Sequence, residues 1–368
     1  MNYFTDRIKD AFSFAISSNF ENYDRQIKAR KRFQEADKIC FWGTGEFFQD
    51  CYKNPGFDFD FVCDNDPSKW GKTFEGKKCL SPDELKQIKE HVVVLVMVGN
   101  YAPIQKQLEE MEIENYNPDD IFCNVFDVKY SSEWFEDNLN KALSTVKILK
   151  DETSKEIYTE AICNRIAPHL AQKKFNEIKI PGEYYRHGVF TLGNDEVMVD
   201  AGAFDGNSVI SFIDTVKGSF EKVYAFELEK NNYDKMLVNL NDYRNKIEFI
   251  NMGVWSHKTT LHFSGESCGC RIDESSTNSV NVISIDDVIN GKKVTLIKMD
   301  IEGSELPALD GAKNTIVTQK PKLAVSAYHM LSDLWNVPQK IHELCPEYKI
   351  YLRHHSPTVW DTDCYAYV

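Results

Sequence analysis

The sequence has no long apolar run. The longest, Val92 to Val98, is far too short to cross a bilayer. The first twenty residues carry Asp6, Lys9 and Asp10 among their apolar positions, so they are expected to form an amphipathic helix and not a signal peptide. We therefore expect a cytoplasmic protein with no integral membrane segment. A lipid-linked substrate would have to be met at the membrane surface.

Positive charge is also scarce. The chain has 43 Lys and Arg against 57 Asp and Glu, a formal net charge of −14. Wrapping nucleic acid needs a basic face, and an anionic membrane surface attracts basic segments, so the sequence argues against both partners. The hydrophobic share, 42%, is enough for packed cores. A chain of 368 residues is expected to form two domains.

The ten cysteines show no regular spacing, which is typical of reduced thiols in a protein core and not of a disulfide framework. Cys268 and Cys270 form the one close pair. A structural zinc site would need a second pair, and none appears, so no metal ligands are assigned here.

Apolar strands alternating with helical patterns predict an α/β protein with two Rossmann-like, doubly wound sheets in series. We expect the second to be seven-stranded and a helical connector to join the two. The expected segments are an N-terminal helix (1–35), a small Rossmann-like domain (36–130), the connector (131–185) and a larger domain (186–368). In the small domain we expect strands over 38–43, 57–62 and 92–98.

The first glycine turn, Gly43-Thr-Gly45, follows a predicted strand and opens a helix, so its amides could face a phosphate. Asp64 ends the next strand, and Gly99 with Tyr101 follows a third. These five residues are the candidate substrate site of this domain, which resembles the small Rossmann-like domains of sugar-nucleotide-modifying enzymes. The fingerprint is only partial, and a strand-to-helix turn without a ligand is the alternative.

The second glycine turn is the strongest signal in the chain. An apolar strand ends at Asp200, and Gly202 and Gly206 follow with a GxxxG spacing. NAD would require a closer glycine for its pyrophosphate, whereas S-adenosylmethionine (SAM) has no phosphate. The turn is therefore expected to hold the amino-acid end of SAM, with its ammonium near Asp200. Glu227, at the end of the next strand, is expected to accept the ribose hydroxyls.

A third strand ends at Asp300, beside the same crevice, and Lys298 lies two residues back on the same face. A lysine and an aspartate on a buried strand are costly unless they are paired or used. They are candidates for catalysis, and a structural ion pair is the alternative.

Residues from about 150 to 368 resemble the FkbM family of SAM-dependent methyltransferases. The stretches that carry the resemblance are Asp200-Ala-Gly-Ala with Gly206, Phe226-Glu227, Val282-Ile-Ser-Ile-Asp286-Asp287, Ile297-Lys-Met-Asp300-Ile-Glu-Gly303-Ser-Glu305, Ser326-Ala-Tyr-His329 and the linker Leu149-Lys-Asp151-Glu-Thr-Ser154. Members mostly O-methylate sugars and related natural products. One departure is Phe204, where many members carry asparagine.

The resemblance implies cofactor contacts along the turns that follow the strands, and the turn at 251–253 would border the adenine. The candidate cofactor residues are Asp200, Gly202, Ala203, Phe204, Gly206, Glu227, Asn251, Met252, Gly253 and Asp300. The expected substrate is a sugar, nucleotide-sugar or glycan hydroxyl in surface polysaccharide or natural-product biosynthesis.

Methyl transfer from a sulfonium is an in-line displacement, so the enzyme mainly positions the acceptor, and a base helps to remove the hydroxyl proton. Candidates for that chemistry are Asp300, His329 and Lys298, and a structural histidine is the alternative for His329. Glu302, Arg353 and His354 are candidate substrate contacts. A divalent metal could bridge Asp300 and His329 if His354 or His355 approached them.

Two other functions stay open at this point. The first domain could serve an NAD-dependent sugar-nucleotide dehydrogenase or epimerase, although no tyrosine–lysine pair of the short-chain dehydrogenase type is present there. The second domain could be a SAM-binding scaffold without catalysis. The residues do not decide which atom is methylated, and a homo-oligomer is compatible with the sequence.

Overall fold

The structure is a computed structural model that describes residues 3–124, 128–264, 271–272 and 279–368. The chain folds into two units. The first comprises Met1–Leu139, Thr159–Lys179 and Ser356–Trp360, and the second comprises Asn140–Tyr158, Ile180–His355 and Asp361–Val368. The segment expected as a helical connector is thus divided between the units. Among the described residues, no helix combines the length and the hydropathy needed to cross a bilayer.

The first unit contains a six-stranded sheet in the order β3-β4-β2-β1-β5-β6. All its neighbouring strands pair in parallel except β3 and β4. The strands are β1 (Lys38–Trp42), β2 (Phe61–Cys63), β3 (Thr73–Phe74), β4 (Lys77–Leu80), β5 (Val92–Val96) and β6 (Asn115–Tyr116). The helices are α1 (Tyr3–Ser17), α2 (Glu21–Gln34), α3 (Glu46–Cys51), α4 (Pro82–Lys86), α5 (Ala102–Glu110), α6 (Pro118–Ile121) and α9 (Phe175–Ile178), while α7 (Ser132–Ile148) and α8 (Glu152–Ile166) span the boundary between the units.

The strand expected over 57–62 is wrong at its first four residues, because β2 begins only at Phe61. The rings of Phe57 and Phe59 still pack in the core, where each stacks on a phenylalanine of a neighbouring element. The Asp60 carboxylate, and not a strand carbonyl, accepts the Ile39 N–H at 2.9 Å. Alternating aromatic residues were therefore a sign of burial and not of strand pairing.

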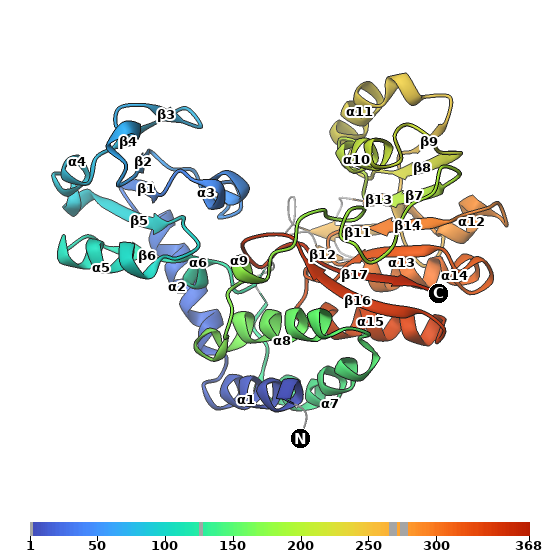
Figure 1. Ribbon diagram of the computed structural model, residues 1–368, viewed down its shortest axis with the longest axis horizontal. Coiled ribbons are helices and arrows are strands. Elements are labelled where there is room, and N and C mark those ends of the chain that lie inside the picture. Colours follow the sequence, from blue (N-terminus) through green and yellow to red (C-terminus); the bar gives the residue numbers. More distant parts are fainter. Residues whose placement is uncertain (1–2, 125–127, 265–270, 273–278) are drawn as a thin grey trace. The chain divides into compact units, whose positions relative to one another are not determined.

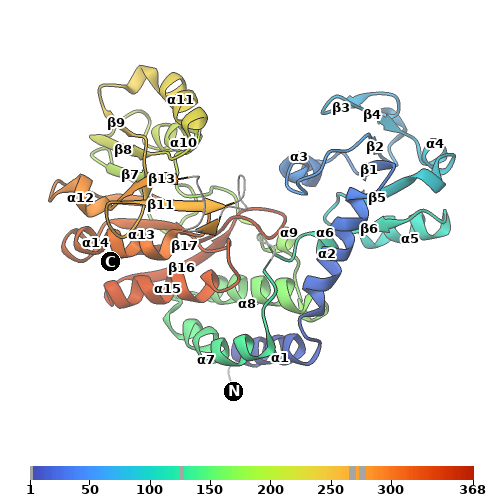
Figure 2. The same cartoon turned by 180° about the vertical axis from the view of Figure 1, so that it is seen from behind.

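The second unit contains a seven-stranded sheet in the order β16-β17-β15-β14-β7-β8-β9 (Figures 1 and 2). Strand β17 pairs antiparallel with both β15 and β16, and every other neighbouring pair in this sheet is parallel. The strands are β7 (Val197–Ala201), β8 (Lys222–Phe226), β9 (Ile247–Ile250), β14 (Leu296–Met299), β15 (Lys322–Ser326), β16 (Lys349–His354) and β17 (Thr362–Tyr367). The doubly wound α/β fold expected from the sequence is confirmed.

Most helices of the second unit lie between successive strands of its large sheet. They are α10 (Asn207–Thr215), α11 (Lys230–Asn239), α12 (Ile285–Ile289), α13 (Glu305–Gly311), α14 (Lys313–Gln319) and α15 (Asp333–Leu344). In Figure 1, α10 and α11 lie together near β8, α13 and α14 lie together near β17, and α15 lies near β16. A smaller sheet, which the sequence did not indicate, has the order β10-β13-β11-β12 and consists of β10 (Gly253–Val254), β11 (Thr259–Ser264), β12 (Arg271–Ile272) and β13 (Ser279–Ile283).

The central strands β7 and β14 are buried along their whole length, as the near-continuous apolar runs of a covered parallel sheet require. After β7 the chain continues to β8 on one side, whereas β14 lies on the other side. The carboxyl ends of β7, β8 and β14 therefore border a topological switch point. In open α/β sheets this is where ligands bind.

Gly202 is required by the close packing at this switch point. Its φ is +81°, and a Cβ atom there would lie 1.9 Å from the carbonyl oxygen of Asp300. Gly218 has a similar φ of +76°, but open space surrounds the corresponding position. The two glycines thus separate the cost of a left-handed backbone from the cost of a steric clash.

We expect Gly202→Ala to lower the free energy of unfolding by at least ~2 kcal/mol more than Gly218→Ala, which should cost only the ~1–2 kcal/mol of the left-handed conformation. Urea unfolding followed by tryptophan fluorescence measures both variants. Equal losses would show that the turn can move away from Asp300.

Candidate functional site

The turn after β7 is tied to the end of β8 by backbone hydrogen bonds. The N–H groups of Gly202 and Ala203 both donate to the carbonyl oxygen of Phe226, at 3.1 and 2.9 Å. Phe204 takes a left-handed conformation, with φ of +52°, and its N–H donates to Glu227 Oε2 at 2.9 Å. The glycine turn and the carboxylate predicted for the ribose therefore form one connected structure.

Glu227 is buried, with 8% of its surface exposed, whereas Phe204, whose N–H donates to it, and the next residue, Leu228, have exposed apolar side chains, at 57% and 42%. Burial raises the pKa of Glu227, although N–H groups of Phe204 and Glu229 donate to its two oxygens. A carboxylate with free lone pairs beside apolar surface can bind a nucleoside, since it accepts the ribose hydroxyls while the base packs on the apolar groups.

The turn after β9 closes the same edge of the sheet. The Asn251 side chain donates to the carbonyl oxygens of Glu227 and Leu228, at 2.8 and 3.2 Å. Gly253 lies close to Val282 and Leu228, since a Cβ atom there would be 3.1 and 3.5 Å from their methyl groups. The structure thus brings residues 251–253 next to the Glu227 turn, as the adenine prediction requires.

Asp200 and Lys298 form a buried ion pair, with 0% and 2% of their surfaces exposed and 3.1 Å between Lys298 Nζ and Asp200 Oδ1. Ser208 Oγ donates to the second oxygen of Asp200 at 2.5 Å, and Lys298 Nζ donates to the carbonyl oxygen of Gly202 at 2.7 Å. Lys298 therefore holds the turn, which favours the alternative of a structural ion pair, although its partner is Asp200 and not Asp300. The buried Asp200 carboxylate is likewise engaged by Lys298 and Ser208.

Asp300 lies directly after β14, and its carboxylate accepts hydrogen bonds from two tyrosines. Tyr184 Oη donates to Oδ2 at 2.8 Å, and Tyr328 Oη donates to Oδ1 at 3.2 Å. Burial alone would raise the pKa of Asp300, but the charges of His329 and Lys298 and these hydrogen bonds hold it below its ordinary value. A quarter of the side chain, 26%, stays exposed, so an ionised carboxylate can meet a ligand here.

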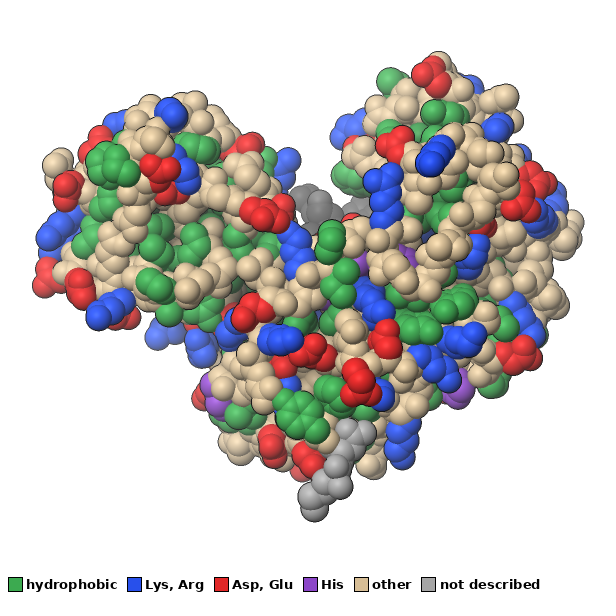
Figure 3. Space-filling view, in the orientation of Figure 1, with side chains coloured by type: hydrophobic (Ala, Val, Ile, Leu, Met, Phe, Trp, Pro, Cys, Tyr) green, Lys and Arg blue, Asp and Glu red, His purple; other side chains and the backbone are tan. Residues whose placement is uncertain are grey.

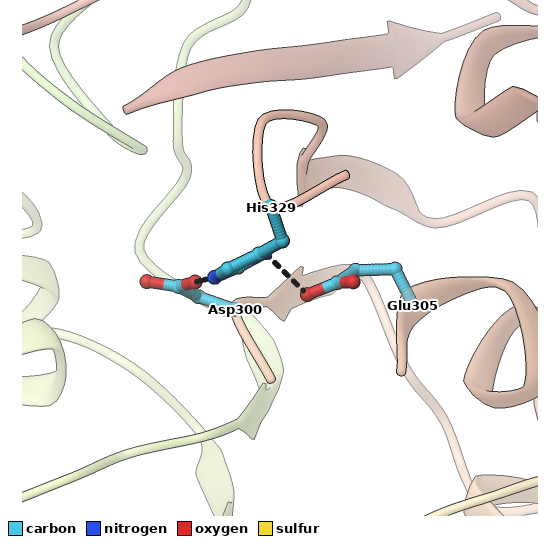
Figure 4. Close-up of side chains that lie close together, drawn as sticks. All are labelled: Asp300, Glu305 and His329. Carbon is cyan, nitrogen blue, oxygen red and sulfur yellow. Dashed lines mark ion pairs between the residues drawn. The ribbon is translucent and has the colours of Figure 1, made fainter. Parts of the chain in front are cut away.

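His329, after β15, lies among carboxylates (Figure 4). Nε2 is 3.4 Å from Asp300 Oδ1 and 3.4 Å from Glu302 Oε2, while Nδ1 is 3.3 Å from Glu305 Oε1. Burial would lower the pKa of His329, but the neighbouring charge of Glu305 and the other two carboxylates raise it well above its ordinary value. His329 is thus close to Asp300, as predicted, and Glu302 joins the same cluster.

The two candidates on β16 have partners within the unit. Arg353 donates to Asp151 Oδ2 at 2.6 Å and to Ser154 Oγ at 2.9 Å, and His354 Nδ1 lies 2.8 Å from Thr362 Oγ1. These contacts favour a structural role for Arg353 and His354 over the expected contact with a substrate. His355, which lies 2.8 Å from Tyr365 Oη, does not join the Asp300 cluster either.

In the first unit, most of the residues predicted to bind a substrate are already in contact with other residues of the chain. A Cβ atom at Gly43 would lie 2.8 Å from the Met97 carbonyl oxygen, and one at Gly99 would lie 2.4 Å from the Asn176 amide nitrogen. Asp64 accepts hydrogen bonds from the backbone and hydroxyl of Thr44 and from Lys69, at 2.8–3.2 Å. This arrangement favours the alternative of a turn without a ligand.

Tyr101 and Gly99 line a cavity in the first unit, together with Asp119, to which Tyr101 Oη donates at 2.6 Å. The volume of this cavity, about 20 Å³, is far below the few hundred Å³ that a bound cofactor fills. Gly45, at the start of α3, has open space at its Cβ position and does not line this cavity.

Several residues of the second site were not predicted as site residues. Glu305 and Tyr328 occur inside the stretches that resemble the FkbM family, so their position gave a signal that was not used. Leu228 directly follows Glu227, the carboxylate predicted to bind the ribose. An exposed apolar residue at that position is a usable sign of a surface that binds a nucleoside base. Tyr184 follows the Pro181-Gly182 break, and nothing in the sequence relates it to Asp300.

The close cysteine pair, Cys268 and Cys270, lies outside the described residues. Within the described part of the chain, the group of side chains spaced to hold a metal ion is Asp300, Glu305 and His329.

Comparison with known proteins assigns a class to this site. Residues 200–354 match a family model described as methyltransferase FkbM domain, and residues 35–118 match one described as C2185-like, N-terminal. The second unit therefore carries a SAM-dependent methyltransferase domain. That domain is of the FkbM type. No curated protein matches the sequence. The expected resemblance of the first unit to sugar-nucleotide enzymes is not supported.

The crystal structure of methyltransferase FkbM from Methylobacillus flagellatus KT is 24% identical, covers 99% of each chain and has a TM-score of 0.68, so the two proteins share a fold. An rRNA methylase from Streptococcus thermophilus is 17% identical over 48% of this chain and 86% of its own, with a TM-score of 0.32. Aeropyrum pernix fibrillarin with natively bound S-adenosyl-L-methionine is 11% identical over 49% and 70%, with a TM-score of 0.32. These last two partial likenesses carry no argument.

The Asp200–Lys298 pair yields a stability prediction. Lys298→Met should lower the free energy of unfolding by ~3–5 kcal/mol, because it leaves the Asp200 carboxylate buried without its counter-charge. Lys293→Met removes a lysine that is 46% exposed and bridges Asp195 and Glu221, and it should cost under ~1 kcal/mol.

The double variant Asp200→Asn/Lys298→Met should lose less than Lys298→Met alone, since the amide removes the unpaired charge. Urea unfolding of the three variants measures these differences in the free energy of unfolding. If Lys298→Met costs no more than Lys293→Met, the pair does not hold this part of the fold together.

Proposed function

We propose that the second unit transfers the methyl group of SAM to a hydroxyl of a sugar, nucleotide-sugar or glycan, in the biosynthesis of a surface polysaccharide or natural product. One observation carries the proposal. Gly202, Glu227 and a partly exposed Asp300 follow three adjacent strands at the switch point of the sheet. This arrangement supplies a turn for the amino-acid end of SAM, a carboxylate for its ribose and a polar group beside the methyl group.

In this proposal the nucleoside of SAM lies over the ends of β8 and β9. Glu227 accepts the ribose hydroxyls, and the adenine packs against Leu228 and the turn at 251–253. The amino-acid end lies over the Gly202–Gly206 turn. Because Asp200 is fully buried, we assign the ammonium to backbone carbonyl groups of the turn and not to the Asp200 carboxylate.

The acceptor approaches from the side of Asp300. When bound, SAM would supply an activated methyl group for in-line displacement by the acceptor hydroxyl oxygen, which would leave S-adenosylhomocysteine and pass the hydroxyl proton to solvent. Asp300 accepts a hydrogen bond from that hydroxyl and so fixes its direction, while Tyr184 and Tyr328 fix Asp300. Orienting the two reactants in this way is the largest contribution the chain can make, since the sulfonium is already activated.

Oxygen as the methylated atom and a sugar as the acceptor rest on the resemblance to FkbM enzymes. On the face shown in Figure 3, basic and acidic side chains are interspersed, so this face offers a polyanion no continuous basic stripe. The dehydrogenase alternative has less support, because Asp64 is already hydrogen-bonded and the nearby cavity is small.

A panel of nucleotide-sugars and glycans, incubated with the protein and isotopically labelled SAM, tests the proposal. We expect a methylated product for at least one acceptor. Asp300→Asn should lower kcat about 100-fold or more while SAM affinity stays within about threefold, because a neutral amide oxygen replaces the charged, more basic carboxylate that accepts from the acceptor hydroxyl. If no acceptor is methylated although SAM binds, the scaffold alternative is favoured.

Cofactor binding has its own prediction. Glu227→Gln should weaken SAM binding about 10- to 100-fold, since one charged hydrogen-bond acceptor for the ribose is lost. Glu221→Gln removes a carboxylate from the opposite end of β8 and should leave the Kd within about twofold. Isothermal titration calorimetry measures both, and equal affinities in the two variants would place the ribose elsewhere.

A further inference from the structure

Asp300, Glu305 and His329 come from three elements and meet at the carboxyl edge of the large sheet (Figure 4). Asp300 follows β14, Glu305 begins α13, and His329 lies three residues after β15. One donor atom from each residue can be chosen so that all three lie within 4.8 Å of one another. We infer that these residues bind a divalent metal ion beside the methyl acceptor.

The distances in the cluster differ from those of ordinary hydrogen bonds. The imidazole nitrogens of His329 lie 3.3–3.4 Å from the nearest oxygens of Asp300 and Glu305. Charge-assisted hydrogen bonds are ~2.7–2.9 Å long, and the same carboxylates make contacts close to that length elsewhere. Tyr184 donates to Asp300 at 2.8 Å and Ile301 N–H donates to Glu305 at 2.9 Å.

The spacing does suit a metal ion. Ligand atoms that each lie ~2.0–2.3 Å from one ion, at angles between 90° and 110°, are ~2.8–3.8 Å apart, and ligands on opposite sides of the ion are ~4–4.6 Å apart. The two imidazole nitrogens now face different carboxylates. Binding to all three residues therefore requires the ring to turn, so that one nitrogen points between the two oxygens.

Glu305 supplies a second, independent observation. Its side chain is 1% exposed, and its Oε1 accepts the Ile301 N–H. Its Oε2 is buried and has no hydrogen-bond donor among the described residues. A desolvated carboxylate oxygen without a donor is unfavourable, and coordination to a cation is one way to satisfy it.

The net charge of the cluster also favours a bound cation. Two carboxylates surround one imidazole, and Glu302 contributes a third within 3.4 Å of it. A protonated His329 imidazole alone leaves part of the negative charge of these carboxylates uncompensated. The nearby Lys298 does not supply the missing charge, because it is paired with Asp200. A divalent ion with a neutral imidazole balances Asp300 and Glu305 completely.

The donor set selects the ion. Two carboxylates and one imidazole form an oxygen-rich donor set, which suits Mn²⁺ or Mg²⁺. Structural zinc sites are instead rich in cysteine thiolates. Glu305 and His329 are each 1% exposed, whereas Asp300 is 26% exposed, so the open positions of the ion would face the acceptor on the Asp300 side. There the ion would hold the acceptor oxygen and lower the pKa of its hydroxyl. This use of the ion rests on the proposed methyl transfer, but its binding does not.

The test is a titration of the full chain with MnCl₂, in which electron paramagnetic resonance reports free Mn²⁺. We expect one ion per chain. Glu305→Gln and His329→Asn should each weaken binding at least tenfold, and Asp287→Asn, which removes an exposed carboxylate of α12, should change the affinity less than twofold. Wild-type SAM affinity in each variant shows that the fold is intact.

Absence of Mn²⁺ binding at millimolar concentration would overturn the inference, as would binding that both variants retain. In the first case the cluster is an imidazolium held by carboxylates. The proposed function fails separately. Methyl transfer that continues in excess EDTA contradicts the catalytic use of the metal and leaves the methyltransferase intact, whereas Mn²⁺ binding by a chain that does not bind SAM supports the metal site alone.

Discussion

The buried ion pair between Asp200 and Lys298 is the constraint on which the second unit depends. It joins the ends of the two central strands, and Lys298 also holds the carbonyl group of Gly202. Two charges are tolerated there only because each has a partner and further hydrogen bonds. The carbonyl group of Asp300 then packs where a side chain of residue 202 would lie. The position of Asp300 thus follows from contacts that never reach the ligand.

This arrangement separates the groups that build the crevice from those that face it. Asp200 and Lys298 are buried, and they fix the turn. Glu227 and Asp300 keep lone pairs or surface available. Backbone N–H groups hold Glu227 in place, and two tyrosines hold Asp300. Groups that are fixed before a ligand binds lose little freedom on binding, which favours both affinity and orientation.

The sequence predicted the large sheet well, because buried parallel strands such as 197–201 and 296–299 have continuous apolar runs. It also predicted that Glu227, Asp300 and His329 share one edge, since the carboxyl ends of parallel strands meet there. It did not reveal the direction of each side chain. The ion-pair partners of Asp200, Lys298 and Arg353 were not predicted, because a sequence shows that a charge is buried but not which partner neutralises it. Tyr184 was not predicted, because it lies in a loop that only tertiary packing brings to Asp300.

The central claim is that the edge formed by β7, β8 and β14 binds SAM. A crystal structure of the protein with S-adenosylhomocysteine tests it most directly. The account predicts the ribose hydroxyls on Glu227, the adenine against Leu228, and the sulfur atom on the side of Asp300. A nucleoside bound elsewhere, for example at the Gly43 turn of the first unit, would contradict it.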